Sequence, residues 1–560
     1  MVIRRNVRSV SESSFSGNLI SLLTETVKLT PEQTAIIETM GGTVSSKNFQ
    51  ELYKDVQNCA AYLNSKGLVA GDKVLLFVTP GYKLTILVFA IIYLGAIPVI
   101  IDPGMGIRSV LSSIRSTLPN ILIGIPLVYW ASFGFWKTFK SVRKKILVTE
   151  SLFDREMTAQ STTNNFKQVS PQRDDLAAIV FTSGSTGPPK GVKYLHKNFN
   201  AQVHSLKENF GLQRGEIDLA TLPVFSLFNP ALGITTILPE FNPRKPAAAN
   251  SEEIVHAIQK FKVTTAFASP VIGRKILEYC TLNKINLPGM KRIFLAGAPS
   301  PPSLIEDLSK VLGNGTVYIP YGATEALPVA FSTSSQVIRN AKGVLSGGGS
   351  LLGQAIPKVS IKIFSSSQGG LSTPSLEVTE CKQGEVGEIC VSGDIVTDGY
   401  YRKPGASFDA RLEFRGSIFH RMGDLGYFDN DHCLRFLGRK AECLITDQGP
   451  LETERCEPMV NAFPEVKRSA LIGVGPPRQQ SPCIVVELEN KELNGNAKQS
   501  LRTKVLEALN NSFPKFGFSR VVWENKIPVD ARHNAKIHRL SLSKKWHLLI
   551  ERNPKFGCKE

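Results

Sequence analysis

Residues 181–191 read Phe-Thr-Ser-Gly-Ser-Thr-Gly-Pro-Pro-Lys-Gly, a run of hydroxyl-bearing and glycine residues that cannot pack into a core. Such a run bends tightly and turns backbone N–H groups and hydroxyls toward one point, where Lys190 adds a positive charge. This combination suits phosphate oxygens. An apolar strand over 176–181 leads into the loop, and a helical face follows it, formed by Phe199, Val203, Leu206 and Phe210. The order of strand, glycine-rich loop and helix favours a phosphate-binding loop.

Two other interpretations of this loop are weaker. A flexible surface linker would also be rich in Gly and Ser, but linkers rarely end in Pro-Pro-Lys-Gly. A nucleoside-triphosphatase P-loop needs Gly-Lys followed by Ser or Thr, whereas Lys190 is followed by Gly191 and Val192. The sequence therefore predicts phosphate binding by a loop of a different class.

Composition narrows the class of protein. The 560 residues exceed what one hydrophobic core usually supports, so a large domain and a smaller one are expected. A net charge of +18 favours anionic partners, but no nucleic-acid reader motif is present and a nucleic-acid partner is not expected. The nine cysteines form no Cys-x-x-Cys pair and no zinc-type cluster, which suits reduced thiols in a cytoplasm. No apolar segment follows the basic residues near the start, so no secretory signal is predicted.

Two apolar stretches raise the question of membrane contact. Residues 84–101 carry no charge and are long enough for a membrane span, but Gly95 and Pro98 interrupt them, which favours a buried helix, a turn and a buried strand. Residues 121–136 are apolar and aromatic and precede a basic cluster. That pattern fits interfacial membrane contact as well as a core segment followed by a solvated face, and the sequence leaves both open. The cluster comprises Lys137, Lys140, Arg143, Lys144 and Lys145.

Strand and helix patterns alternate as far as about residue 360, which indicates parallel sheets covered by helices. Short β-type runs follow from about residue 356. After Arg439, strands are expected over 470–474, 484–488 and 521–523, with an amphipathic helix over 501–513. The predicted fold is a large α/β N-terminal domain, 1–438, with doubly wound sheets and a small β-rich subdomain. A smaller, mobile α+β domain is predicted for residues 439–560.

Further motifs follow the loop in a fixed order: Leu295-Ala-Gly-Ala-Pro, Tyr321-Gly-Ala-Thr-Glu, Arg421-Met-Gly-Asp, Leu437-Gly-Arg and Pro528-Val-Asp-Ala-Arg-His-Asn-Ala-Lys-Ile. Together with the loop, they resemble the adenylate-forming superfamily of acyl-CoA synthetases, luciferases and adenylation domains, over about residues 30–545. The resemblance implies an enzyme that joins a carboxylate to ATP, releasing pyrophosphate and leaving an acyl-adenylate. Magnesium is expected to bridge phosphate oxygens.

The resemblance also implies roles for individual residues. The β- and γ-phosphates would lie against Thr182, Ser183, Gly184, Ser185, Thr186, Gly187 and Lys190. Adenine would stack on Tyr321, beside Gly322 and Ala323, with Gly297, Ala298 and Pro299 lining its other side. Thr324 would contact the α-phosphate, Glu325 would hold magnesium, and Asp424 would accept both ribose hydroxyls with help from Arg439. Lys536 would reach the α-phosphate and the carboxylate during adenylation. Taken singly, Glu325 also fits a helix cap, Asp424 a turn and Lys536 a solvated surface charge.

Departures from the superfamily pattern narrow the activity. Ala535 precedes Lys536 where Gly is usual, Ala441 stands where a charged hinge residue is usual, and Phe225-Ser-Leu-Phe-Asn-Pro-Ala-Leu-Gly replaces an aromatic–His pair at the acyl pocket. These changes put a CoA-dependent second half-reaction in doubt. With these departures, the sequence resembles the β-lactone synthetases of bacterial long-chain olefin biosynthesis. This resemblance implies a long-chain 2-alkyl-3-hydroxy fatty acid as substrate. Its 3-hydroxyl would attack the adenylate and close a four-membered lactone, releasing AMP.

Several alternatives remain open at this stage. A medium- or long-chain acyl-CoA ligase is the main rival function, and an anion-binding protein without activity is a second. His196 and His533 are candidates for the base that takes the hydroxyl proton, although both also fit structural or surface roles. Partners are expected to be the hydroxy fatty acid and other enzymes of the olefin pathway. The expected location is cytoplasmic, with peripheral contact at the inner membrane as an open alternative.

Overall fold

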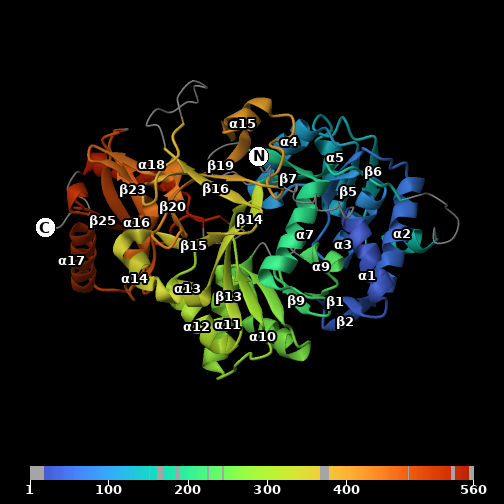
Figure 1. Ribbon diagram of the computed structural model, residues 1–560, viewed down its shortest axis with the longest axis horizontal. Helices are drawn as coiled ribbons and strands as arrows, with labels where there is room; N and C mark the ends of the chain where they lie inside the picture. Colours follow the sequence, from blue (N-terminus) through green and yellow to red (C-terminus); the bar gives the residue numbers. More distant parts are fainter. Residues whose placement is uncertain are drawn as a thin grey trace, which may run out of the picture.

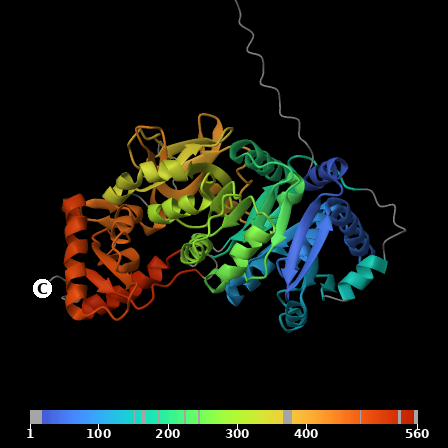
Figure 2. The same cartoon turned by 90° about the horizontal axis from the view of Figure 1, so that it is seen from below.

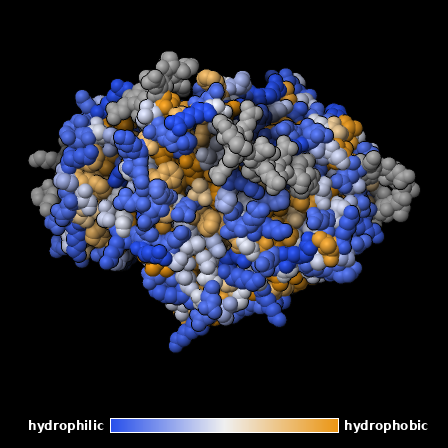
Figure 3. All heavy atoms as spheres, viewed as in Figure 1, coloured by the Kyte–Doolittle hydropathy of each residue, from blue (hydrophilic) through white to orange (hydrophobic). Residues whose placement is uncertain are grey.

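The fold is described from a computed structural model (Figure 1). The residues that it describes are 18–149, 152–159, 168–182, 188–222, 226–242, 245–365, 378–476, 478–530 and 536–553. A C-terminal unit forms one end of the molecule, orange to red in Figures 1 and 2. A helix-covered sheet, largely blue to green, forms the opposite end, and a larger sheet lies mostly between them. The face in Figure 3 is largely hydrophilic, with small hydrophobic patches between charged side chains.

The first sheet has, among the described residues, six strands in the order β6-β5-β3-β4-β7-β8. Its neighbours pair in parallel except for β7 with β8. The strands are β3 (Lys73–Phe77), β4 (Ile97–Ile100), β5 (Ile121–Gly124), β6 (Lys144–Leu147), β7 (Leu176–Thr182) and β8 (Lys190–Leu195). The helices that accompany it are α2 (Phe49–Ser65), α3 (Tyr82–Tyr93), α4 (Ile107–Thr117), α5 (Pro126–Gly134), α6 (Leu152–Ala159) and α7 (His196–Phe210).

The apolar stretch 84–101 folds as the sequence predicts. It forms most of α3, a turn at Gly95 and strand β4. Helix α3 is apolar on all sides because nearly all its residues are buried in the core of this sheet, beside α2. Of the described helices, none combines the length and the apolarity needed to cross a bilayer.

The predicted order around residues 181–191 needs one correction. The loop does not lead directly into a helix, because β8 follows it and pairs antiparallel with β7, Thr182 opposite Lys190. The helix then begins at His196, with Val203, Leu206 and Phe210 buried as expected. Gly191 is required in this hairpin, since a Cβ there would lie 2.8 Å from the Phe181 ring and 2.9 Å from Ile179 Cγ2. The alternation of β8 was hidden by its glycine and two lysines.

The larger sheet has fourteen strands in the described residues. Strands β1, β10, β9, β11, β12 and β13 pair in parallel, and those from β14 onward pair antiparallel. The predicted β-rich subdomain therefore continues this sheet rather than forming one of its own. The strands are β1 (Thr34–Met40), β2 (Thr43–Asn48), β9 (Ile217–Ala220), β10 (Thr235–Leu238), β11 (Thr265–Ala268), β12 (Arg292–Leu295), β13 (Thr316–Ala323), β14 (Ala326–Thr333), β15 (Ser350–Ala355), β16 (Ser360–Phe364), β17 (Gly387–Ser392), β18 (Arg411–Phe414), β19 (Ser417–Phe428) and β20 (Leu434–Arg439).

The helices of this part cover the sheet and bury Leu, Ile and Val side chains against it. Gly273 on α11 lets that helix approach closely, because a Cβ there would lie 2.9 Å from Leu295 of β12. The helices are α1 (Leu19–Leu29), α9 (Asn229–Leu232), α10 (Ser251–Lys260), α11 (Pro270–Leu282), α12 (Pro302–Leu312), α13 (Ser334–Arg339), α14 (Ala341–Gly343) and α15 (Pro404–Asp409), with short turns η2 (Pro246–Ala248) and η3 (Val344–Gly348). A further turn, η1 (Pro103–Met105), belongs to the first sheet, where it precedes α4.

The C-terminal unit follows a short turn, η4 (Lys440–Glu442), and has its own cores. The three predicted strands and the predicted helix are present within a few residues of their expected bounds, while α16 and α18 were not foreseen. Helix α16 packs both on β23 and on η3 of the large domain, so it joins the two parts. The elements are β21 (Leu444–Thr446), β22 (Gly449–Leu451), α16 (Thr453–Val460), β23 (Val466–Val474), β24 (Ser481–Leu488), α17 (Gly495–Ser512), η5 (Pro514–Phe516), β25 (Val521–Trp523) and α18 (Arg539–Arg552).

Candidate active site

Two of the predicted motifs meet where neighbouring strands of the larger sheet end. Strands β12 and β13 are parallel, so the turn Gly297-Ala298-Pro299, directly after β12, lies at the same edge as Tyr321 near the end of β13. Gly297 has φ +96°, a backbone conformation that residues with a Cβ rarely adopt. This edge, at the carboxyl ends of parallel strands, is where ligands bind in open α/β sheets.

Asp424 joins this edge from β19 and is almost completely buried. Its Oδ2 accepts a hydrogen bond from the Tyr321 hydroxyl at 2.6 Å, and Arg439 Nε lies 3.1 Å from its Oδ1. Oδ1 is buried and has no hydrogen-bond partner in the described structure. Because buried polar atoms are nearly always hydrogen-bonded, this oxygen has acceptor capacity for a ligand hydroxyl.

Burial and the neighbouring groups shift the pKa of Asp424 in opposite directions, and the net shift is upward. Burial raises the pKa of Asp424, while the guanidinium of Arg439, the Tyr321 hydrogen bond and the charge of Lys536 lower it. Burial and the adjacent carboxylate raise the pKa of Tyr321 well above its usual range, so its phenol stays protonated and donates. The sequence-predicted residues Tyr321, Asp424 and Arg439 thus form one buried group.

A second group lies around Glu325. The Tyr400 hydroxyl donates to Glu325 Oε1 at 2.9 Å, and Lys190 Nζ lies 4.7 Å from the centre of the Tyr400 ring. The Tyr194 hydroxyl donates to the backbone carbonyl of Thr324 at 2.6 Å. Tyr400 therefore joins Lys190, at the end of the glycine-rich loop, to Glu325, although these residues come from different sheets. A carboxylate beside a lysine is suited to a phosphate and its divalent cation.

Sequence reasoning missed Tyr194, Tyr400 and His420 as members of this group. His420 of β19 is buried, which lowers its pKa and keeps the imidazole neutral at pH 7, and it lies near the charges of Glu325 and Lys190. Tyr400 lies in the segment Gly399-Tyr-Tyr-Arg-Lys-Pro, and His420 directly precedes the Arg421-Met-Gly-Asp motif. No local pattern distinguishes them there, because each depends on a contact with a distant strand.

Some predicted residues are only partly described. Thr182 is described as the last residue of β7, without its side chain, and Ser183, Gly184, Ser185, Thr186 and Gly187 lie outside the described residues, as do His533 and Ala535. Gly322 and Ala323 are the last two residues of β13. A Cβ at Gly322 would lie 2.6 Å from the Ala326 carbonyl, so this residue must be glycine for the hairpin to close.

Lys536 reaches the site from the C-terminal unit. Its side chain is exposed, and its backbone N–H donates to Asp530 Oδ1 at 2.8 Å. Its charge contributes to lowering the pKa of Asp424, so the two side chains lie in the same region. The structure thus brings Lys536 toward the large-domain group, although Lys536 and Asp424 are 112 positions apart in the sequence.

Arg539, three residues further, anchors this segment. It donates to both carboxylate oxygens of Glu457 on α16, at 3.0 and 2.6 Å, and to Glu442 of the hinge turn at 2.6 Å. All three side chains are mostly buried. A charge-assisted, bidentate contact of this kind is stronger than a surface ion pair and fixes the direction of the chain.

Comparisons with known proteins agree with this arrangement. A family model described as AMP-binding enzyme matches residues 23–401. An olefin beta-lactone synthetase of Xanthomonas campestris is 35% identical over 89% of this chain and 90% of its own. The chain belongs to the AMP-binding enzyme family. It is accordingly an adenylate-forming, AMP-forming enzyme of the ligase type, as the motifs predicted.

A second relative and a solved structure agree with this assignment. An olefin beta-lactone synthetase of Stenotrophomonas maltophilia is 36% identical over 86% of this chain and 88% of its own. Among solved structures, the O-succinylbenzoate coenzyme A synthetase of Bacillus subtilis, in complex with ATP and magnesium ion, has a TM-score of 0.74. It shares 21% identity and covers 93% of this chain and 98% of its own, a likeness of fold. The resemblance to β-lactone synthetases stated from the motifs is confirmed.

In this AMP-binding enzyme, the short turn η4 lies where the sequence predicts a hinge. Ala441 is exposed on the turn η4. The neighbouring charges are engaged elsewhere, because Lys440 Nζ donates to Glu388 of β17 at 2.9 Å and Glu442 pairs with Arg539. The domain boundary between residues 438 and 439 stays a prediction. Strand β20 ends at Arg439, and the turn η4 follows it directly.

An aromatic wall borders the Thr324 region. Phe228, before α9, lies 6.1 Å from Phe199, and Phe199 stacks on Tyr194 at 5.0 Å between ring centres. Asn229 is not part of this apolar surface, since it donates to Asp218 and Thr236 in the core. Phe228 thus belongs to a continuous aromatic row that ends at the carbonyl of Thr324.

Of the two histidines considered as bases, His533 lies outside the described residues, and His196 does not join these groups. His196 is buried at the start of α7, where burial lowers its pKa to about 4, and its backbone N–H donates to the Asp175 carbonyl. It therefore fits a structural role. No cluster of three or more acidic, histidine or cysteine residues suited to a metal occurs in the described part of the chain.

Proposed function

We propose that this enzyme activates a long-chain 2-alkyl-3-hydroxy fatty acid with ATP and closes the resulting acyl-adenylate to a β-lactone. The observation that carries the proposal is the identity of 35–36% to two proteins named olefin beta-lactone synthetase, each over more than 85% of the chain. Relatives named as CoA ligases are 24–26% identical. The unusual hinge, with an uncharged Ala441, supports the same choice.

In the first half-reaction, the acid's carboxylate oxygen attacks the α-phosphorus of ATP, and the bond to pyrophosphate breaks. Asp424 would accept the ribose hydroxyls through Oδ1, which is paired with Arg439 but accepts no hydrogen bond in the described structure. Tyr321 and the Gly297 turn would hold adenine. Lys190 would neutralise the outer phosphates. Lys536 would stabilise the charge that develops between carboxylate and α-phosphate.

Magnesium fits the Glu325 group. One carboxylate is enough for this ion when substrate phosphates and water supply its other ligands, and the absence of a larger acidic cluster from the described residues is consistent with that mode. Magnesium would neutralise phosphate charge when bound. Tyr400 would hold the Glu325 carboxylate in a fixed orientation through its hydrogen bond.

In the second half-reaction, the substrate's own 3-hydroxyl oxygen attacks the acyl carbon. The bond from the acyl carbon to the AMP oxygen breaks, AMP leaves, and the hydroxyl proton is lost. Because the nucleophile is tethered to the electrophile, no second substrate has to be ordered. Ring strain opposes closure, and the mixed anhydride supplies the driving force. The aromatic row Phe228–Phe199–Tyr194 would give the alkyl chains an apolar wall beside Thr324.

The test is an assay with ATP, magnesium and a 2-alkyl-3-hydroxy acid in the absence of CoA. Lactone and AMP should form in equal amounts. The matched control is the same acid lacking the 3-hydroxyl, which should support pyrophosphate–ATP exchange but give no lactone. An acyl-CoA ligase would instead release AMP steadily only when CoA is added, with a thioester as product. That result would overturn the lactone proposal and leave adenylation intact.

A further inference from the structure

Helix α5 exposes apolar side chains that a folded protein normally buries. It spans Pro126–Gly134, directly after β5, and only Ser132 in it is buried. Leu127 is 76% exposed and Trp130 65%, and Trp136 just beyond the helix is also 65% exposed. Val128 faces the sheet and fills the space beside Gly124. The opposite side of α5 is therefore an apolar surface without a core to join.

The exposed rings form one surface rather than scattered side chains. The Tyr129 ring lies 5.2 Å from that of Trp130 and 5.6 Å from that of Phe133, and the latter two lie 6.0 Å apart. Lysines border it: Lys145 Nζ lies 3.5 Å from the centre of the Phe133 ring and Lys137 Nζ 5.8 Å from Trp136. Such aromatic residues bordered by lysines are typical of membrane-water interfaces.

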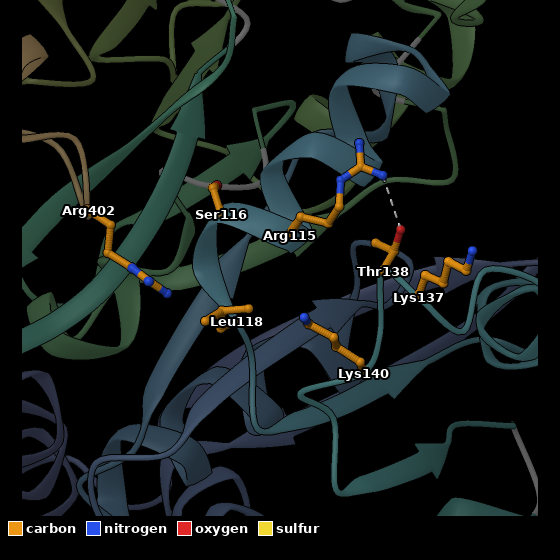
Figure 4. A pocket seen from close by; sticks show the side chains of 7 residues that line it. All are labelled: Arg115, Ser116, Leu118, Lys137, Thr138, Lys140 and Arg402. Carbon is orange, nitrogen blue, oxygen red and sulfur yellow. Dashed lines mark hydrogen bonds between the residues drawn. The ribbon is translucent and has the colours of Figure 1, made fainter.

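A basic hollow lies beside this surface (Figure 4). Its volume is about 440 Å³, and four of its seven lining residues are cationic: Arg115, Lys137, Lys140 and Arg402. Lys140 and Arg402 extend toward each other from opposite sides, across Leu118. No carboxylate lines the hollow. Arg115 is held by Thr138, to which it donates at 3.4 Å.

The charge of this region has one sign over a long stretch of chain. Between Pro103 and Thr149 there are seven basic residues and no acidic one. Of these, Arg143 is paired with Asp72. A surface that combines exposed aromatic side chains with several unopposed cations is complementary to a bilayer containing anionic lipids. Each such lysine or arginine strengthens binding to an anionic membrane surface.

We propose that α5 and the adjoining hollow form a membrane-docking surface for bilayers that contain anionic phospholipids. Leu127, Trp130 and Trp136 would enter the boundary between headgroups and acyl chains. The hollow between Lys140 and Arg402 would receive a lipid phosphate. The segment Tyr400–Arg402 connects this surface with the candidate active site, because Tyr400 contacts Glu325 while Arg402 lines the hollow.

This inference does not depend on lactone formation, since any enzyme acting on a long-chain acid gains from docking where such acids partition. Its test is sedimentation of the whole protein with vesicles of phosphatidylcholine alone and of phosphatidylcholine with phosphatidylglycerol. We expect binding to the anionic vesicles, weakened by salt, and a shift of tryptophan emission to shorter wavelength. Trp130 and Trp136 are the exposed members of the four tryptophans, so they would report insertion.

Two variants test the two parts of the surface. Lys137→Glu with Lys140→Glu should lower the vesicle affinity about tenfold or more, and Trp130→Ser with Trp136→Ser should lower it and remove the emission shift. The matched control is Lys491→Glu with Lys504→Glu, an equal charge change on exposed lysines in the C-terminal unit, at the other end of the molecule. If net charge alone governed binding, the control would lose as much vesicle affinity as the Lys137/Lys140 variant.

Three outcomes would overturn the proposal. The first is the absence of binding to anionic vesicles at low salt. The second is an equal loss of affinity in the control and in the Lys137/Lys140 variant. The third is self-association that disappears in the tryptophan variant while vesicles are not bound, which would assign the surface to a second copy of the chain. Melting temperature and adenylation rate in detergent-free buffer should be unchanged in all variants, because these side chains are exposed.

Discussion

The large domain and the C-terminal unit contribute to the candidate site in different ways. Asp424 and Glu325 are held in place by hydroxyl groups of tyrosines, and Asp424 is buried. Lys536 is exposed and is fixed through its backbone contact with Asp530 and through Arg539. The difference indicates that the nucleotide-binding groups are preorganised before ATP arrives, whereas the lysine depends on the position of a second unit. Binding and chemistry should therefore respond to different mutations.

Removal of the lysine should have the largest effect. In Lys536→Ala, the adenylation rate constant should fall by a factor on the order of 10²–10³, since one stabilising charge in the transition state is lost. ATP affinity should change only a few-fold. Pyrophosphate–ATP exchange and nucleotide titration measure the two quantities. The control is Lys526→Ala, an exposed lysine of the same unit, which should behave as the parent protein. An unchanged exchange rate would remove Lys536 from the mechanism.

Substitution of Asp424 in the large domain should mainly affect ATP affinity, in contrast to Lys536→Ala. Asp424→Asn should weaken ATP binding by a factor of about 10–100, because hydrogen bonds from ribose hydroxyls to a charged acceptor are lost. The parent protein should discriminate between ATP and 2′-deoxy-ATP, and the variant should discriminate much less. Equilibrium nucleotide titration with both nucleotides measures this difference. If the variant keeps the full discrimination, the ribose is held by another residue.

Much of the candidate site could be predicted from the sequence. The motifs around Tyr321, Asp424 and Lys536 predicted membership of one site, because their order along the chain matches a known family. The sheet arrangement was predictable from alternating apolar runs, and α3 with β4 folded as expected. The alternation was misread at β8, whose two lysines and Gly191 hide a strand that pairs with β7.

The residues that could not be predicted depend on contacts between distant strands. Tyr400 and Glu325 are 75 positions apart, and nothing in their local sequence signals the hydrogen bond between them. Helix α18 was missed because its apolar face is narrow; its buried residues are Leu542, Trp546 and Ile550. Such elements are determined by tertiary packing rather than by local propensity.

The junction between the two parts offers a pH-dependent test. Glu454 on α16 accepts a hydrogen bond from Ser350 of β15 at 2.8 Å, and burial, then repulsion from Glu457, raises its pKa to about 7. A carboxyl with a raised folded-state pKa stabilises the fold fully below its ordinary pKa near 4.5, and this contribution is lost as pH rises through 7. Between pH 5 and 8 the parent should therefore lose stability, and Glu454→Gln should lose less, by about 1–3 kcal/mol.

Denaturant unfolding at several pH values measures this difference. Glu492→Gln, a change at an exposed carboxylate of the same unit, serves as the control and should follow the parent. Parallel pH profiles for the parent and Glu454→Gln would mean that Glu454 stays charged in the folded protein. In that case the packing of α16 on η3 would hold the junction equally well at low and at high pH.

The smallest effect is expected at Tyr400, and it tests the preorganisation of the large domain directly. Tyr400→Phe keeps the ring beside Lys190 and removes only the hydroxyl that holds Glu325. A neutral-to-charged hydrogen bond of this kind is worth about 1–2 kcal/mol, so the magnesium concentration for half-maximal adenylation should rise about 3–10-fold. At saturating magnesium, the rate should approach that of the parent. Tyr401→Phe, at the neighbouring residue, is the control: it keeps the ring that packs on the core of the first sheet and the backbone N–H that donates to the Gly191 carbonyl. Equal shifts in the two variants, or a lower rate that magnesium does not restore, would mean that Tyr400 supports the fold rather than the carboxylate. The contrast between a preorganised large domain and a delivered lysine would then apply to Asp424 only.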